Sequence, residues 1–173
     1  MTHPPATGAT QGEPSAAAQL VRVLTQQGRT LAVAESLTGG LVVAAIVDVP
    51  GASAVLRGGV VAYATDLKAT LLDVDPDLLA REGAVHPDVA AAMARGAAAR
   101  LGAHYAVATT GVAGPDPQDG RPVGEVHVAV TGPGPQGPVT VVTLALDPAL
   151  GRAGIRARAA HEALTLALDQ VGS

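Results

Sequence analysis

The sequence predicts an α/β protein, a single-domain three-layer α/β/α sandwich with a mixed β-sheet. Helical and strand patterns alternate along the chain, and the short aliphatic runs 31–35, 59–63 and 105–109 each end directly in polar, turn-forming residues. Two further runs, 123–131 and 139–146, flank a Gly/Pro-rich turn and predict an antiparallel hairpin. Strands of both directions are therefore expected in one sheet.

The first elements follow from local signals. A helix is expected from about Ser15 to Gln27, because Gly28 is suited to close it as a C-cap. The strand 31–35 comes next, followed by a helix over 38–47. Pro50-Gly51 predicts the turn that ends this segment.

The middle of the chain is expected to alternate in the same way. The run 59–63 predicts a buried strand that ends before Thr65-Asp66, a pair suited to cap the helix that carries Lys68. Short helices are expected near 76–82 and 87–101.

A Gly/Pro-rich loop from Gly111 to Pro122 follows the strand 105–109, and long irregular loops in compact domains are usually functional or disordered. A helix from about Ala149 to Gln170 closes the domain. We expect one domain over 15–171, preceded by a disordered N-terminal tail over 1–14.

Composition excludes several classes of function. Only 15% of the 173 residues are charged, against roughly 25% in average proteins, so much of the surface is expected to be covered by Ala, Gly and Thr or to lie in subunit contacts. A homo-oligomer, a dimer or higher, is therefore expected. The chain has no Phe or Trp and a net charge of −4, which disfavours direct binding of nucleic acid. The absence of Cys removes disulfides, thiolate zinc sites and Cys nucleophiles.

No targeting or metal-binding pattern is visible. The first dozen residues have neither a basic nor an apolar targeting region, and the longest aliphatic run, 41–47, is far shorter than the ~20 residues of a membrane span. We expect a soluble, cytoplasmic protein with no membrane association. The five histidines show no paired metal-ligand spacing, so neither a metal nor another cofactor is expected.

Polar residues follow the predicted strands at Glu35, Tyr63 and Thr109-Thr110. Ligand sites of open α/β sheets lie beyond the carboxyl ends of the strands, so these segments are expected to converge on one site. Two reactive side chains belong to them, the Ser36 hydroxyl and the amine of Lys68, the one lysine of the chain.

Ser36 is the first candidate nucleophile. It stands in the segment Ala-Glu-Ser-Leu-Thr-Gly-Gly, at a strand-to-helix junction where backbone N–H groups can face an anion or a developing oxyanion. The alternative is that Ser36 only caps the helix over 38–47. Glu35 is expected to anchor the loop to neighbouring N–H donors rather than to act as a general acid.

Lys68 is the candidate base for the serine hydroxyl. A lysine can act in this way only if burial and nearby dipoles lower its pKa from ~10.4 toward neutrality. The first turn of a helix favours this, because the macrodipole there disfavours a cation. The alternative is a solvated surface lysine on an amphipathic helix.

Four motifs in order resemble the CinA C-terminal domain family, the nicotinamide mononucleotide amidohydrolases. They are Ala-Glu-Ser-Leu-Thr-Gly-Gly at 34–40, Asp-Val-Pro-Gly-Ala-Ser at 48–53, Tyr-Ala-Thr-Asp-Leu-Lys at 63–68, and Thr-Gly-Val-Ala-Gly-Pro at 110–115 with Pro-Val-Gly at 122–124. The resemblance implies hydrolysis of the carboxamide of nicotinamide mononucleotide to nicotinate mononucleotide and ammonia, by a serine nucleophile and a lysine base without metal.

The resemblance also implies roles for individual residues. Ser36 is expected to be the nucleophile and Lys68 its base, with Tyr63 and Thr110 as hydrogen-bonding partners that orient the lysine. The oxyanion donors are expected among the amides from Thr38 to Gly40, with the loop from Thr110 to Gly114 as an alternative. The residues expected to bind the substrate are Thr38, Gly39, Gly40, Gly111, Gly114, Arg152 and Arg156, the two arginines as phosphate or ribose ligands or, alternatively, as ordinary solvated helix residues.

Two other functions stay open at this point. A non-catalytic nucleotide-binding or regulatory module linked to competence or DNA damage is one, because a fold can keep its pocket and lose its chemistry. Hydrolysis of a different amide is the other. Many relatives carry a larger N-terminal domain, and we expect a stand-alone form here because nothing before Ser15 has the composition of a folded unit.

Overall fold

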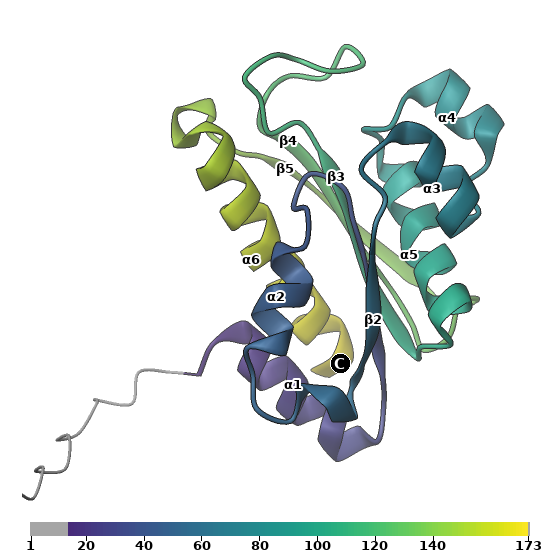
Figure 1. Ribbon diagram of the computed structural model, residues 1–173, viewed down its shortest axis with the longest axis vertical. Helices are drawn as coiled ribbons and strands as arrows, with labels where there is room; N and C mark the ends of the chain where they lie inside the picture. Colours follow the sequence, from purple (N-terminus) through teal and green to yellow (C-terminus); the bar gives the residue numbers. More distant parts are fainter. Residues whose placement is uncertain (1–13, 173) are drawn as a thin grey trace, which may run out of the picture.

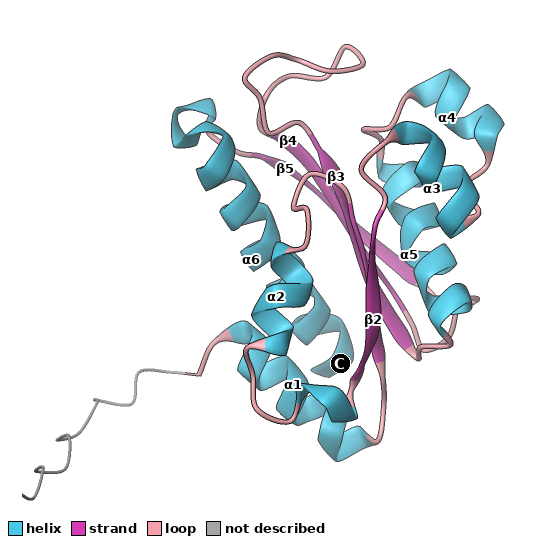
Figure 2. Ribbon diagram, viewed as in Figure 1, coloured by secondary structure: helices cyan, strands magenta, loops and turns pink. Residues whose placement is uncertain are grey.

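Five strands form one mixed sheet in the computed structural model, which describes residues 14–172 (Figures 1 and 2). Their order in the sheet is β2-β1-β3-β4-β5, with β1 parallel to both of its neighbours and β4 antiparallel to both of its own. The strands are β1 (Leu31–Glu35), β2 (Leu56–Val61), β3 (Tyr105–Gly111), β4 (Glu125–Thr131) and β5 (Val139–Ala145). The predicted mixed sheet is confirmed.

Helices cover both faces of this sheet (Figure 1). On one face lie α1 (Ala16–Gln27), α2 (Leu41–Val47) and α6 (Gly151–Gly172). On the other face lie α3 (Thr65–Leu72), α4 (Pro76–Glu82) and α5 (Pro87–Leu101). The three-layer α/β/α sandwich expected from the alternation of patterns is therefore confirmed.

The two faces of β1 show how the sequence divides the core. Alternate side chains of a strand point to opposite faces, so Leu31 and Val33 pack under α1, α2 and α6, whereas Ala32 and Ala34 face α5. Small residues on the second face let α5 approach the sheet closely. Since all five residues of β1 are buried, the strand is a fixed base for the residues that follow it.

Gly96 sets the distance between α5 and α3. A Cβ atom at this position would lie 1.8 Å from the Leu72 carbonyl oxygen at the end of α3, so only glycine fits without a backbone shift. The close contact holds α3 against the core and, with it, the side chain of Lys68 one helical turn earlier.

Gly96→Ala is expected to lower the free energy of unfolding by about 2 kcal/mol, because overpacking outweighs the better helix propensity of alanine. Urea denaturation measures the change. Gly172→Ala is the matched control, since a Cβ there meets nothing within 4 Å, and it should leave stability unchanged within ~0.5 kcal/mol. A Gly96→Ala protein as stable as the parent would contradict the close α3–α5 contact.

The N-terminal helix matches its prediction, and Gly28 closes it in the left-handed conformation. The next predicted helix was too long: α2 begins at Leu41 rather than at 38. Gly39 and Gly40 adopt φ values of +58° and +100°, which interrupt the helical path and create a turn after β1.

Other boundaries also differ from the expected ones. β2 lies earlier than 59–63, because its pairing with β1 begins at Leu56 and ends where β1 ends. The Thr65-Asp66 capping prediction was wrong: Ala64 is the N-cap of α3 and makes no side-chain cap bond. β3 continues to Gly111, which pairs with Val126 of β4.

The last helix begins at Gly151, after a 3₁₀ turn over Pro148–Leu150. The expected N-terminal tail, except for Pro14, lies outside the described residues. Among the helices of residues 14–172, none has the length and apolar character needed to cross a membrane.

Candidate active site

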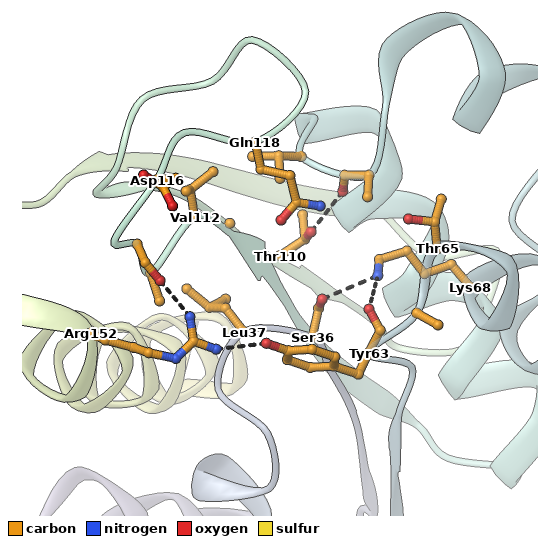
Figure 3. A pocket seen from close by; sticks show the side chains of 16 residues that line it. Ser36, Leu37, Tyr63, Thr65, Lys68, Thr110, Val112, Asp116, Gln118 and Arg152 are labelled. Carbon is orange, nitrogen blue, oxygen red and sulfur yellow. Dashed lines mark hydrogen bonds between the residues drawn. The ribbon is translucent and has the colours of Figure 1, made fainter.

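A cavity of about 260 Å³ opens beyond the carboxyl ends of β1 and β3 (Figure 3). Its walls come from the turn after β1, the segment 63–68, the residues before α5, the loop that follows β3, and the start of α6. The three strand ends singled out in the sequence thus contribute to one site. Ser36, Tyr63, Lys68 and Thr110 all line it.

The backbone before and after Ser36 is held by hydrogen bonds that leave its hydroxyl facing the cavity. The Ser36 amide donates to the Thr109 carbonyl, and the Gly39 amide donates back to the Ser36 carbonyl at 3.1 Å. The capping alternative for Ser36 is wrong, since Gly40 is the N-cap of α2. Glu35 caps the helix with its side chain instead: its buried carboxylate accepts from three amides at the start of α2, those of Gly40, Val42 and Val43.

Lys68 points its amine at Ser36 (Figure 3). Its Nζ lies 3.1 Å from Ser36 Oγ, 2.9 Å from the Ala62 carbonyl oxygen and 3.4 Å from the Tyr63 carbonyl oxygen. With only 1% of its surface exposed, the side chain is not the solvated lysine of the alternative interpretation.

Burial lowers the pKa of Lys68 from its ordinary value of 10.5 to about 8. The dominant cause is desolvation, which penalises the charged ammonium. The carboxylates of Asp119 and Asp66 act in the opposite direction and raise the pKa. Lys68 is therefore about one-tenth neutral at pH 7 and about half neutral at pH 8, far more than a lysine of ordinary pKa, as a general base requires.

Protonation of Lys68 can be measured directly, because it is the one lysine of the chain. Protein labelled with [¹³Cε]-lysine should give a single side-chain resonance that titrates near pH 8. The free energy of unfolding should rise as the pH increases from 8 to 10.5, because the lysine of the unfolded chain still holds a proton that the folded protein has lost. A titration midpoint near ~10.4 would contradict the buried environment.

The expected side-chain partners of Lys68 were wrong. Tyr63 contacts Lys68 only through its backbone carbonyl, while its phenol hydroxyl, on a side chain that is largely exposed, lies 2.6 Å from an Arg152 nitrogen. Thr110 donates its hydroxyl to the Ala84 carbonyl at 2.7 Å. Its contribution is to fix the cavity wall that carries Ala84 and Val85.

The two arginines expected to bind substrate occupy different places. Arg152 lines the cavity and donates to the Gly114 carbonyl and to the Tyr63 hydroxyl, both at 2.6 Å. Arg156 lies one helical turn later and does not line the cavity. It donates to the carbonyls of Leu37 and Thr38, so the expectation of a phosphate or ribose ligand was wrong for this residue.

Of the small residues expected to bind substrate, some line the cavity and others do not. Gly111 and Gly114 line the cavity, whereas Thr38, Gly39 and Gly40 do not. Thr38 is buried with its hydroxyl 2.7 Å from that of Thr109. The amides of Gly39 and Gly40 are bonded to Ser36 and Glu35, so they are not available as oxyanion donors.

Some cavity residues were not singled out in the sequence. Leu37 follows the nucleophile, and Asp116 and Gln118 belong to the loop 111–122, which was expected to be either functional or disordered. The nearby carboxylate of Asp119 accepts from the Ala84 amide at 3.0 Å. The length of the loop was the available signal, but it did not indicate which of its side chains face the cavity.

No group of three or more His, Asp or Glu side chains within residues 14–172 is arranged to hold a metal ion. The buried His127 instead pairs with Thr143 and Glu125 across and along the sheet.

Residues 13–171 match the family described as the CinA C-terminal domain. The chain belongs to the CinA C-terminal domain family. Solved members share the fold: a competence/damage inducible protein, CihA, from Agrobacterium tumefaciens is 34% identical with a TM-score of 0.82, covering 95% of this chain and 100% of that one. The competence damage-inducible protein A from Klebsiella pneumoniae is 29% identical with a TM-score of 0.85, over 91% and 95% of the two chains.

Curated CinA-like relatives are similar in sequence as well. A CinA-like protein from Frankia casuarinae is 60% identical over 111 residues, 64% of this chain and 26% of that protein. One from Gloeobacter violaceus is 44% identical over 155 residues, 89% of this chain and 36% of that protein. The chain thus spans between about a quarter and about a third of the length of these relatives.

Proposed function

We propose that the protein hydrolyses the carboxamide of nicotinamide mononucleotide to nicotinate mononucleotide and ammonia. One observation carries the proposal: a buried lysine amine with a lowered pKa lies 3.1 Å from a serine hydroxyl inside a cavity. This pair is an activated nucleophile with its base. The choice of substrate rests on membership of the CinA C-terminal domain family and the motif resemblance.

The contacts of Lys68 suit a neutral amine. A neutral amine has two N–H donors and one lone pair, and two backbone carbonyls, those of Ala62 and Tyr63, stand within reach of the donors. When Lys68 is charged, Nζ donates to Ser36 Oγ at 3.1 Å. When it is neutral, its two N–H groups can stay on the carbonyls and its lone pair can accept the Ser36 proton. The amine is thus oriented for proton transfer before substrate binds.

In the proposed reaction, Ser36 Oγ attacks the carboxamide carbon while its proton passes to Lys68. The C–N bond then breaks, and the leaving nitrogen takes the proton from Lys68 and departs as ammonia. The nicotinoyl group stays on Ser36 as an ester. A water molecule adds to this ester with Lys68 as base, and the proton returns to Ser36 Oγ as nicotinate mononucleotide leaves.

The oxyanion of both tetrahedral intermediates needs backbone donors. The Leu37 amide is the leading candidate, since this residue directly follows the nucleophile and lines the cavity. The loop over Gly111–Gly114 lies on the same cavity and is the second source. At the far end Arg152 supplies a cation for the substrate phosphate, and Asp116 supplies a carboxylate for the positively charged pyridinium ring.

The test is release of ammonia and formation of nicotinate mononucleotide from nicotinamide mononucleotide by the purified protein. A folded protein that binds the nucleotide without turnover would favour the regulatory module, an alternative that the competence/damage names of the relatives keep open. A protein that neither binds nor hydrolyses it would point to a different amide. Homo-oligomerisation stays a proposal from composition, and a cytoplasmic location stays a proposal from the lack of a targeting pattern in the sequence.

A metal chelator is expected to leave the rate of ammonia release unchanged, because each proposed proton transfer is assigned to Lys68. The assay compares rates before and after dialysis against EDTA. Strong inhibition that added divalent metal reverses would count against the proposed mechanism.

A further inference from the structure

Arg156 binds the backbone that directly follows the candidate nucleophile. Its Nε donates to the Leu37 carbonyl and its Nη2 to the Thr38 carbonyl, each at 2.9 Å. The planar guanidinium spans two successive carbonyls, a geometry that a lysine ammonium cannot reproduce. Because these donors are directed at the backbone, Arg156 serves the turn over 36–40 rather than the cavity.

The same turn is held from its other end by a negative charge. Glu35 is fully buried and accepts from the amides of Gly40, Val42 and Val43 at 2.9 to 3.2 Å. A cation therefore binds the carbonyls of the turn and an anion binds the amides that follow it. Charge-assisted bonds of this kind are stronger than neutral ones, so both ends of the turn are fixed.

Peptide geometry connects this arrangement with catalysis. A peptide unit is planar, so a bond to its carbonyl fixes the orientation of the whole unit, and Arg156 thereby fixes the Leu37–Thr38 and Thr38–Gly39 peptides. The N–H of the second of these peptides is the Gly39 amide, which donates to the Ser36 carbonyl at 3.1 Å, so the contact with Arg156 also supports the backbone of the nucleophile. Gly39 leaves room for the guanidinium: a Cβ there would lie 3.2 Å from Arg156 Nη2.

We propose that Arg156 is a positioning residue for the serine nucleophile. It holds the turn over 36–40 so that Ser36 Oγ stays within reach of Lys68 and the Leu37 amide, the leading oxyanion candidate, keeps its place at the cavity. This inference rests on the proposed amidohydrolase function. A residue with this role acts in the transition state, so its loss lowers kcat and leaves KM nearly unchanged.

Arg156→Lys is the decisive variant, because it keeps the charge and the helix but not the two-carbonyl contact. We expect kcat to fall by about 10- to 100-fold with KM within about twofold of the parent value. Arg158→Lys is the matched control: this arginine lies on the same helix, is 58% exposed, and pairs with Glu162 at 2.7 Å. It should leave both constants unchanged.

Two outcomes of the kinetic comparison would overturn the inference. A raised KM with unchanged kcat would make Arg156 a substrate ligand. Unchanged kcat and KM would leave it without a role in the reaction. Thermal unfolding of each variant shows whether it is folded at the assay temperature, and Arg156→Gln, assayed under the same criteria, replaces the lysine variant if that one is not.

A second readout separates this inference from the proposed function. A small fluorophosphonate reacts with an activated serine, and intact-mass measurement follows its attachment to Ser36 without any nucleotide. The labelling rate should fall in Arg156→Lys by a factor similar to that of kcat. A parent that is labelled but does not release ammonia would refute the proposed substrate alone, whereas equal labelling of the parent and Arg156→Lys would refute the positioning role.

Discussion

Ser36→Ala is expected to lower the rate of ammonia release from nicotinamide mononucleotide by about 10⁴-fold or more, to the background of the assay. The variant lacks the oxygen that forms the ester, so no covalent route remains. Affinity for the nucleotide should be nearly unchanged, because the hydroxyl is a small part of the cavity surface and Arg152 and Asp116 stay in place. Initial rates and isothermal titration measure the two quantities.

Ser53→Ala is a suitable control for this experiment, because Ser53 lies in the exposed 3₁₀ turn after α2 and outside the cavity. It should retain the parent rate. Turnover by Ser36→Ala at the parent rate would remove Ser36 from the nucleophile role. Loss of nucleotide binding together with turnover would show instead that the hydroxyl helps to hold the substrate.

Lys68→Ala is expected to lower kcat by about 10²- to 10⁴-fold, because general-base assistance contributes rate factors of that size. Lys68→Arg should be equally slow, since a guanidinium does not lose its proton at accessible pH. In the parent, kcat/KM should rise with pH and level off above about pH 8, where Lys68 becomes mostly neutral. Initial rates from pH 6 to 10 give this profile.

The base role of Lys68 predicts that this rise disappears when the lysine is replaced. The residual rate of Lys68→Ala should no longer follow a titration near pH 8. An alanine variant that keeps the parent profile would mean that another group carries the proton. A fully active Lys68→Arg would show that a positive charge, and not a base, is what the site requires.

Local signals in the sequence were sufficient for the fold class. The aliphatic runs at 31–35 and 105–109 and the hairpin over 123–146 have the period and turn residues of strands, and these are properties of neighbouring residues. Errors arose at element ends. The helix after Ser36 was predicted to begin at 38 rather than at Leu41, because the positive φ values of Gly39 and Gly40 depend on the contacts that hold the turn.

In the candidate site, too, the sequence predicted which residues take part but not how they contact one another. The sequence indicated Ser36 and Lys68 from their residue types and their places after strand ends, and it indicated that Glu35 anchors its own loop. It did not indicate which atoms meet: Lys68 is bound by the carbonyls of Ala62 and Tyr63 rather than by the Tyr63 and Thr110 hydroxyls.

The sequence by itself determined the order and type of the elements and the presence of a serine and a lysine at strand ends, because those features depend on residues close together in the chain. Only the tertiary structure decided the partners of side chains far apart. Arg152 and Arg156 are both arginines of α6, one helical turn apart, and the sequence does not distinguish their roles. Packing of α6 beside the turn after β1 places Arg152 at the cavity. It places Arg156 on the carbonyls of Leu37 and Thr38, which are 118 or more residues away in the chain. Burial of Lys68 is likewise a product of packing, since it needs α3 held on α5 at Gly96.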